Sequence, residues 1–405
     1  MSSNTQQEQQ TFPLARTCPF SPPEEYAQMR REEPVRQVTL WSGQRIWAVS
    51  RYQDVRTVLT DERFSADITR EGFPLMRPSV GLAFRSVGRR NFMRMDGPEH
   101  TRLRKMVTQD FTAKAVERWR PEIETLTDGI IEGLLASGKP FDLVSEIAEE
   151  IPTRVICWML GIPEQDRAYF RDLTERYMST QSTPEETRYV VESLIAYLDR
   201  LIDAKRDRPE DDMLSRLVHE HLLPGDLGRE DLNATARLML VAGHESSVSM
   251  ISMGTLALLQ NPEKWDALRA DPSQLSAAVE ELLRYLTVVH QTAVRVTVED
   301  VEIGGVVIPA GQGVIALTSS ADRDGDFFAD PDTIDWTRGR LRQHFAFGYG
   351  PHHCLGHLLA KVELQVVFAA LLRRMPTLSL AVPFADLEFK DDQSISGVTR
   401  LPVTW

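Results

Sequence analysis

The feature that most constrains this chain of 405 residues is one long helical pattern, from about Arg229 to Gln260. It opens with the acidic residues Glu230 and Asp231, which stabilise a helix N-terminus, and it ends at Asn261-Pro262. Roughly 30 residues at a rise of about 1.5 Å each make a helix of about 45 Å. A helix of that length crosses a whole domain, so the other elements have to pack around it.

The centre of this helix reads Ala242-Gly243-His244-Glu245-Ser246-Ser247, within otherwise apolar surroundings. Small side chains allow a flat cofactor to lie against a helix. A glycine and serines in mid-helix also permit a local opening of the hydrogen-bond ladder, which admits water. The segment is therefore a candidate wall for a site that holds a planar group.

Around this helix the pattern predicts mainly α structure with small β-sheets. Residues 35–41 and 45–49 read as two strands around a turn at Ser42-Gly43. Val301–Ile308 reads as a second hairpin, and 311–317 as a further strand. Residues 115–220 are helix-rich, and their breaks contain glycine or proline: Gly138-Lys139-Pro140, Gly161-Ile162-Pro163 and Gln181-Ser182-Thr183-Pro184.

Charge and cysteine content limit the cellular compartment and the classes of partner that we expect. A net charge of −13 argues against nucleic acid or an anionic membrane as the main partner. Three scattered cysteines give no disulfide framework, and neither a signal peptide nor a run of about 18 apolar residues occurs. We expect a cytoplasmic monomer with a disordered tail over residues 1–12 and a single domain over residues 13–405.

A second segment, Phe347 to Leu359, places two glycines and a proline directly before Cys354. Apolar residues at helical spacing follow, so Cys354 lies at or just before a helix N-terminus. Unpaired backbone N–H groups and the helix dipole favour a thiolate there. Gly348 and Gly350 let the backbone adopt φ > 0 and approach a flat object closely. The segment predicts a shielded thiolate aimed at something planar.

Two other interpretations of this cysteine are open on the residues alone. A zinc site would use Cys354 with His352, His353 and His357, although structural zinc sites usually draw on two separated ligand pairs. A cysteine nucleophile would instead pair with a histidine that is distant in the sequence.

The segment resembles the haem-binding signature of cytochrome P450s at every fixed position: Phe347, Gly348, Gly350, His352, Cys354 and Gly356. The central helix resembles that family's Ala-Gly-x-Asp/Glu-Thr-Thr/Ser pattern at Ala242, Gly243 and Glu245, but Ser246 replaces the usual first threonine. The resemblance covers residues 14–405. It implies the cytochrome P450 fold, a helix-rich triangular prism with haem b between the central helix and the proximal helix that follows Cys354.

The resemblance also implies roles for individual residues. Cys354 is the proximal thiolate ligand of the haem iron, and the other residues of the two segments that contact the cofactor are Ala242, Gly243, Phe347, Gly348, His352 and Gly356. Two carboxylates carried into a mostly apolar pocket need cationic donors, and the resemblance supplies them. The implied propionate partners are His100, Arg104, Arg295 and His352.

Glu281 and Arg284 match the family's Glu-x-x-Arg pattern. Three residues apart on a helix, the two side chains can pair on one face. In the family this pair binds an arginine from a later segment, for which we assign Arg338. The implied role is structural.

Candidate substrate-lining residues follow from position in the family and are mostly apolar. The alternative for any one of them is a loop anchor packed on the core. They are Phe73, Met76, Phe84, Phe92, Val241, Val288, Val289, Thr292 and Ile395.

The implied activity is a monooxygenase that hydroxylates or epoxidises a bulky hydrophobic small molecule with dioxygen, with Glu245 and Ser246 as the proton relay. Serine keeps the hydroxyl of the usual threonine but loses the methyl that stiffens χ1. The alternative for this pair is a buried Glu and Ser that merely satisfy a kinked helix. Competing functions are a peroxide-driven peroxygenase and a haem-thiolate sensor without turnover.

Electrons are expected from a ferredoxin and an NAD(P)H-dependent ferredoxin reductase, because no flavin- or ferredoxin-like segment is fused to this chain. A local positive patch near the thiolate would steer an acidic ferredoxin. The candidate residues are Arg102, Lys105, Arg342, His353, His357 and Lys361.

Overall fold

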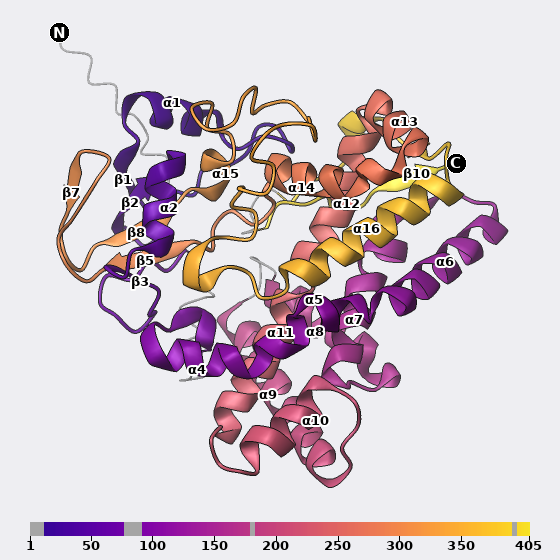
Figure 1. Ribbon diagram of the computed structural model, residues 1–405, viewed down its shortest axis with the longest axis horizontal. Helices are drawn as coiled ribbons and strands as arrows, with labels where there is room; N and C mark the ends of the chain where they lie inside the picture. The colour runs from indigo at the N-terminus through magenta and orange to yellow at the C-terminus, as the bar shows by residue number, and fades with distance from the viewer. Residues whose placement is uncertain (1–11, 77–90, 179–182, 391–394) are drawn as a thin grey trace.

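The computed structural model describes residues 12–76, 91–178, 183–390 and 395–405. Its outline in Figure 1 is roughly triangular, with most of the labelled β-strands at one corner, β10 near the C-terminus on the opposite side, and helices over the rest. This is the mainly α architecture with small sheets that the sequence predicts. No helix among the described residues is long and apolar enough to cross a membrane.

The helices account for most of the described chain. They are α1 Glu24–Glu32, α2 Tyr52–Thr60, α4 Gly97–Thr108, α5 Ala113–Glu117, α6 Arg120–Ser137, α7 Glu150–Leu160, α8 Arg167–Met178, α9 Pro184–Asp207, α10 Met213–Leu217, α11 Arg229–Ala242, α12 Glu245–Leu259, α13 Pro262–Ala270, α14 Leu275–Leu286, α15 Thr318–Ala321 and α16 His357–Arg374.

The predicted breaks between helices are confirmed, with a physical reason at each. Gly138 and Gly161 end α6 and α7 in the left-handed conformation, with φ of 61° and 67°. Thr183 begins α9 through a capping box with Glu186.

The strands are short. They are β1 Val35–Thr39, β2 Arg45–Val49, β3 Phe64–Ser65, β4 Phe141–Asp142, β5 Val294–Thr297, β6 Val301–Ile303, β7 Val306–Ile308, β8 Gly313–Ala316, β9 Ser379–Leu380 and β10 Pro402–Thr404.

The largest sheet among the described residues has the order β1-β2-β8-β5-β3. Strands β1 and β2 form the predicted hairpin, whose turn places Gly43 at φ +80°, and β2 pairs with β8 in parallel, with Trp47 opposite Val314. The predicted second hairpin is β6–β7. Strand β5 thereby carries Arg295 into the interior of the sheet, next to β8.

The prediction of one continuous helix from Arg229 to Gln260 is wrong at its centre. Helix α11 ends at Ala242 and α12 begins at Glu245, with His244 at φ −91° and ψ −74° between them. A Cβ on Gly243 would lie 3.2 Å from the carbonyl oxygen of Met239 and 3.6 Å from Ile156. The break is the local opening of the ladder that a glycine followed by serines permits.

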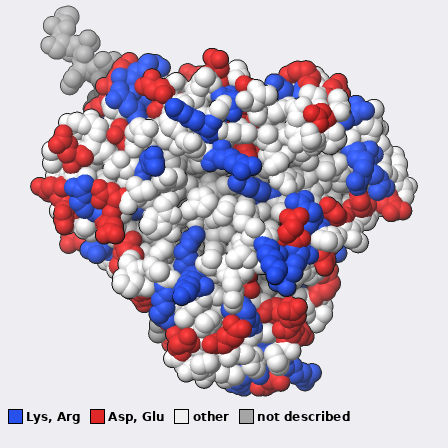
Figure 2. Space-filling view, viewed as in Figure 1, with Lys and Arg blue, Asp and Glu red and all other residues white. Residues whose placement is uncertain are grey.

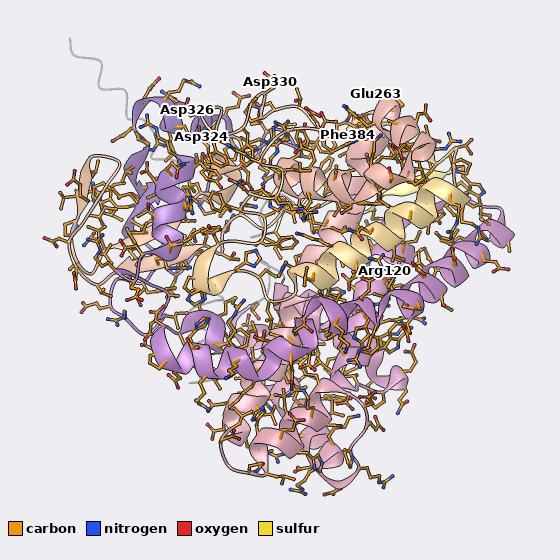
Figure 3. The ribbon with its side chains drawn as sticks, in the orientation of Figure 1. Arg120, Glu263, Asp324, Asp326, Asp330 and Phe384 are labelled. Carbon is orange, nitrogen blue, oxygen red and sulfur yellow. The ribbon has the colours of Figure 1, made fainter. Side chains whose placement is uncertain are left out.

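Two long helices, α12 and α16, pack together beside this break. Helix α12 packs on α14 and α16, and α16 runs beside α6 (Figure 1). Arg120 at the start of α6 donates to Gln365 of α16 across 3.1 Å, and Figure 3 shows it between the two helices. The main apolar core extends through these helices, while two smaller cores lie against the largest sheet.

Candidate active site

The loop before α16 is held in a fixed shape by backbone hydrogen bonds. The N–H of Cys354 donates to the carbonyl of Phe347 across 2.8 Å. Gly348 and Gly350 have φ of +67° and +70°, as predicted, and a Cβ on Gly350 would lie 2.6 Å from the carbonyl oxygen of Leu59 at the end of α2. A larger residue cannot occupy Gly350 without moving α2 away.

Cys354 lies three residues before α16, and its side chain is exposed. Enough protein nevertheless surrounds the sulfur that burial raises the pKa of the thiol, against the N–H of Gly356 and the charge of Arg104, which lower it. The expected preference for thiolate therefore does not result from the protein alone. A bound metal cation would supply the missing stabilisation, since a coordinating thiol loses its proton.

The histidines beside Cys354 do not form a zinc site. Within the described residues, no group of three or more His, Cys, Asp and Glu side chains is arranged to hold a metal ion. His357 donates from Nδ1 to the carbonyl of Cys354 across 2.9 Å, so it is not placed as a base on the thiol.

Four basic groups from three elements meet on one side of this loop. His100 from α4 is buried, and its ring lies 4.5 Å from that of His352. Burial, together with the charges of His352, Arg104 and Arg295, lowers the pKa of His100 to about 4. Arg295, on β5, is buried and donates to the carbonyl of its neighbour Val294 across 2.8 Å. The structure therefore brings together the four residues expected to hold propionates.

This cluster fits a ligand that carries carboxylates. His100 Nε2 is buried and has no hydrogen-bond partner in the part of the chain that the structure describes. Asp96 lies 3.6 Å from His352 and offsets one charge of the cluster. Sequence reasoning missed Asp96, which accepts from the Ala66 N–H at 3.0 Å. In the sequence, Asp96 is only an acidic residue four positions before His100, and nothing there indicates that it lies beside His352.

The break between α11 and α12 exposes a narrow strip in the middle of an otherwise buried helix pair. Ala242 is exposed and Ser246, one turn later, is partly exposed. The hydroxyl of Ser246 donates to the carbonyl of Ala242 across 3.3 Å. Small residues line the strip, which matches the predicted resting surface for a planar group.

The carboxyl of Glu245 points away from solvent. Its exposed fraction is 6 %, and its Oε1 accepts from Lys390 Nζ across 2.5 Å. Sequence reasoning missed Lys390, because it lies 145 residues away along the chain. The next residue but one, Ser247, donates to Glu363 of α16 across 2.8 Å.

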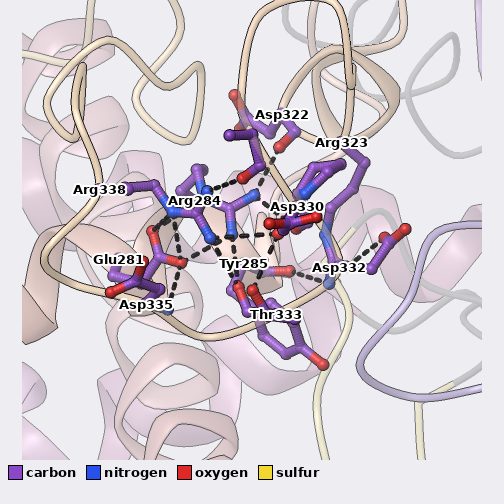
Figure 4. A network of polar contacts seen from close by, with 12 residues as sticks. Glu281, Arg284, Tyr285, Asp322, Arg323, Asp330, Asp332, Thr333, Asp335 and Arg338 are labelled. Atoms are coloured by element: carbon purple, nitrogen blue, oxygen red, sulfur yellow. Dashed lines mark hydrogen bonds and ion pairs between the residues drawn. The ribbon is translucent and has the colours of Figure 1, made fainter.

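The predicted structural trio is confirmed. Glu281 accepts from Arg284 at 2.8 and 2.9 Å and from Arg338 at 2.9 and 3.0 Å. Arg284 also donates to the carbonyls of Asp322, Pro331 and Thr333 (Figure 4). The side chains of Glu281 and Arg284 are fully buried.

The candidate lining residues divide by their packing. Phe73 and Met76 are buried in the smaller core against the sheet, which favours the loop-anchor interpretation for both. The other members that the structure describes lie in or against the main core or are more exposed: Phe92, Val241, Val288, Val289, Thr292 and Ile395. Val289 and Ile395 pair through their backbones. Phe84 lies outside the described residues.

Lysines and arginines surround a largely uncharged centre on the face that carries α16 (Figure 2). Arg102 and Lys105 of α4 are exposed, and Arg342 has 79 % of its side chain exposed. Lys361 is mostly covered and donates to Glu280 across 2.8 Å.

The two candidate surface histidines add little positive charge to this face. Burial lowers the pKa of His353 to about 4 and also lowers the pKa of His357, so both rings are neutral near pH 7. The expected positive patch therefore rests on the lysines and arginines.

Comparison with known proteins gives one consistent family. Residues 175–400 match the sequence model described as "Cytochrome P450". The chain is 45 % identical to "Cytochrome P450-SU2" of Streptomyces griseolus, over 98 % of this chain and 97 % of the relative. It is 40 % identical to "20-oxo-5-O-mycaminosyltylactone 23-monooxygenase" of Streptomyces fradiae, over 97 % of this chain and 92 % of the relative.

Solved structures agree. The crystal structure of the mycinamicin VIII C21 methyl hydroxylase MycCI from Micromonospora griseorubida, bound to mycinamicin VIII, superposes with a TM-score of 0.91. It is 37 % identical, and the match covers 98 % of this chain and all of that one.

Proposed function

Because the chain belongs to the cytochrome P450 family and is a monooxygenase of that family, we propose that it hydroxylates or epoxidises a bulky hydrophobic small molecule, either a natural product or a xenobiotic. We further propose haem b as the cofactor, a ferredoxin and its NAD(P)H-dependent reductase as the electron source, and a cytoplasmic monomer. The observation that supports this most is the meeting of four basic groups beside an exposed thiol.

In this proposal each residue of the site has a distinct task. When bound, haem supplies dioxygen binding and the oxidising power for insertion into a C–H or C=C bond. Cys354 ligates the iron through its thiolate. His100, Arg104, Arg295 and His352 bind the two propionates, which compensates their burial with charge-assisted hydrogen bonds.

Proton delivery is assigned to Glu245 and Ser246. The Ser246 hydroxyl, which donates to Ala242 in the structure, can turn toward the exposed strip and donate there. Serine has a looser χ1 than threonine, so this rotation meets less resistance. Glu245, one residue away in the sequence, passes on the replacement proton.

The ligation and the activity are tested separately. The reduced protein with carbon monoxide is expected to give the absorption band typical of thiolate-ligated haem, and the Cys354→Ser variant to lack it. A native protein without that band contradicts the ligation. Consumption of NADPH and release of an oxygenated product with a generic ferredoxin pair then separate a monooxygenase from a sensor, and turnover with peroxide alone identifies a peroxygenase.

The electron donor is proposed to dock on the face of α4 and α16 (Figure 2). Attraction between this face and an acidic ferredoxin predicts a kcat/KM for ferredoxin that falls as ionic strength rises. Arg342→Glu tests the face more cleanly than Lys361→Glu, because 79 % of the Arg342 side chain is exposed and it lies 3.7 Å from Glu280, whereas Lys361 is mostly covered and bound to Glu280 across 2.8 Å. Arg206→Glu on α9, with 46 % of its side chain exposed, is the control. Equal losses in both variants, or turnover that is independent of salt, contradict docking here.

The substrate class is inferred from the apolar lining residues and from relatives that act on large molecules. The substrate named for the Streptomyces fradiae relative and mycinamicin VIII are therefore the first compounds to screen. Substrate binding is read from a spin-state shift of the haem absorption. Small polar compounds are expected to give no shift, and a shift with them alone contradicts the proposed class.

A further inference from the structure

A buried ion pair joins the proposed proton donor to the C-terminal part of the chain. Lys390 Nζ lies 2.5 Å from Glu245 Oε1, and 17 % and 8 % of the two side chains are exposed. A buried carboxylate without a partner is strongly destabilised, so the ammonium sets both the charge and the direction of Glu245.

The position of Lys390 is fixed by a hairpin-like backbone arrangement that presses on α12. The N–H of Lys390 donates to the carbonyl of Gly397 across 2.9 Å, and Phe389 pairs with Val398. A Cβ on Gly397 would lie 2.8 Å from the hydroxyl oxygen of Ser249, one turn beyond Glu245. Glycine at this position lets the strand approach α12 closely enough for a lysine to reach Glu245.

Lys390 also lines a small cavity. Its volume is ≈ 20 Å³, and Lys390, Arg16, His290 and Ser396 contribute to its wall. Space of about 10–15 Å³ measured in this way is enough for one water molecule, provided that two or more polar groups bind it. The wall offers such groups, since Arg16 Nε is buried without a partner in the described chain and the Ser396 hydroxyl lies 3.3 Å from His290 Nδ1.

The ammonium of Lys390 can bind Glu245 and a water molecule in this cavity at the same time. It carries three N–H donors, of which one is directed at Glu245. A water in the cavity can accept from a second donor. His290 does not compete as a cation, because burial lowers its pKa to about 3.

We propose that Lys390 is a positioning residue for proton delivery, which orients Glu245 and joins its carboxyl to a water site in the cavity lined by Arg16, His290 and Ser396. Lys390 Nζ gives a proton to the Glu245 carboxylate and recovers one from this water, which solvent replenishes. Glu245 passes its proton to the Ser246 hydroxyl, which gives its own proton to the site, so every group ends with the protons it began with. The inference rests on the proposed role of Glu245.

The test uses the haem-loaded protein with its substrate and a ferredoxin pair. Lys390→Met removes the ammonium, Lys390→Arg keeps a charged donor, and Lys205→Met removes another buried ammonium, paired with Asp212 at 2.7 Å and with Glu210 at 2.5 Å, away from the site. Three quantities are measured: product formed per NADPH consumed, the ratio of turnover rates in ordinary and heavy water, and hydrogen–deuterium exchange of residues 243–249 in the resting protein.

We expect product per NADPH to fall about threefold in Lys390→Met, with a larger heavy-water ratio, because reprotonation of Glu245 becomes slow. Lys390→Arg is expected to restore most of the coupling. Exchange over residues 243–249 is expected to rise in Lys390→Met only. Lys205→Met is expected to keep coupling and the heavy-water ratio.

Two results would overturn the inference. One is native coupling and a native heavy-water ratio in Lys390→Met, which makes the ion pair structural only. The other is an equal loss in Lys205→Met, which points to general destabilisation. Glu245→Gln separates the proposed role of Glu245 from that of Lys390. Native coupling in Glu245→Gln contradicts the role of Glu245 itself. A loss of coupling in Glu245→Gln but not in Lys390→Met supports the role of Glu245 and contradicts that of Lys390.

Discussion

Two regions of this protein bury charged groups in opposite ways. In the network around Arg284, the guanidinium donates to Glu281 and to the carbonyls of Asp322, Pro331 and Thr333 (Figure 4). At the active site, by contrast, polar atoms are buried without a partner in the described chain: His100 Nε2, both ring nitrogens of His244, and the Ser249 hydroxyl.

The difference separates polar groups that hold the fold from those that serve a ligand. An unsatisfied buried donor or acceptor costs about 1–3 kcal/mol, so a chain retains several in one place only where another molecule satisfies them. The guanidinium donors of Arg284 and Arg338 are matched to acceptors, and their sequence signature with Glu281 predicts a structural role, whereas the neighbouring Arg323 Nε is buried without a partner in the described chain. The site leaves room for the partners that a cofactor and water supply.

The largest effect on stability is expected from breaking the ion pairs of Glu281 with Arg284 and Arg338. Glu281→Gln keeps the shape of the side chain but leaves the charges of Arg284 and Arg338 without their carboxylate. We expect the free energy of unfolding to fall by about 3–5 kcal/mol, as for other buried ion pairs that lose one partner. Denaturant unfolding of the native protein and the variant measures it.

The control for this change is Glu263→Gln on the exposed first turn of α13, labelled in Figure 3. It makes the same chemical replacement at the surface, so its effect is expected to stay within about 0.5 kcal/mol. Similar losses in both variants would show that the network is not special.

A second prediction concerns Glu363, a buried carboxyl whose one hydrogen-bond partner among the described residues is Ser247. Burial raises the pKa of Glu363 from 4.5 to about 8, so the folded protein binds this proton more tightly than the unfolded chain does. Stability is therefore expected to fall as pH rises from about 4.5 to 8, by about 1.4 kcal/mol for each unit of pKa shift.

Glu363→Gln removes that proton equilibrium and is expected to flatten the dependence. Asp322, whose pKa burial raises to about 6, contributes the same sign of slope in both proteins and cancels in their difference. Parallel stability curves for the native protein and Glu363→Gln across this range would contradict the assignment.

A third prediction concerns a polar group of the site that is buried without a hydrogen-bond partner in the described chain. His100→Leu removes a buried donor that has no partner in the described chain, so the haem-free protein is expected to lose no stability. Haem affinity is expected to fall about tenfold, the loss of one hydrogen bond to a charged group. Haem transfer to apomyoglobin measures the affinity.

The control is His219→Leu at an exposed position, since His219 Nε2 has a partner, the carbonyl of Lys205 at 3.1 Å. This variant is expected to lose stability and keep its haem affinity. The reverse pattern in the two variants would overturn the distinction between satisfied and unsatisfied histidines.

The same contrast explains what the sequence can predict. Glu281, Arg284 and Arg338 were assigned correctly, because two of them pair at a spacing of three on one helix and the third follows a known family order. The loop at Gly348 and Gly350 follows from backbone sterics. Local rules of this kind depend on neighbouring residues, and a single sequence contains them.

Partners that are distant in the chain could not be predicted. Glu245 and Lys390 meet only because a backbone pairing brings Gly397 against α12. Helical periodicity likewise does not reveal the interruption at Gly243-His244, which only the glycine and serines indicate. The charge of His353 was misjudged for the same reason, since its pKa depends on burial by the folded protein.

The smallest expected effect is at Ser246, where the chain departs from its family pattern. Ser246→Thr adds a methyl that restricts χ1, so the hydroxyl spends more time in one direction. We expect product formed per NADPH to rise by about twofold and released peroxide to fall, with stability unchanged within about 0.5 kcal/mol. Because Ser246 is partly exposed beside Ala242, the strip has room for the methyl. Unchanged coupling in Ser246→Thr would mean that the looser rotamer of serine does not limit proton delivery, and the reprotonation of Glu245 through Lys390 would then be the slower step.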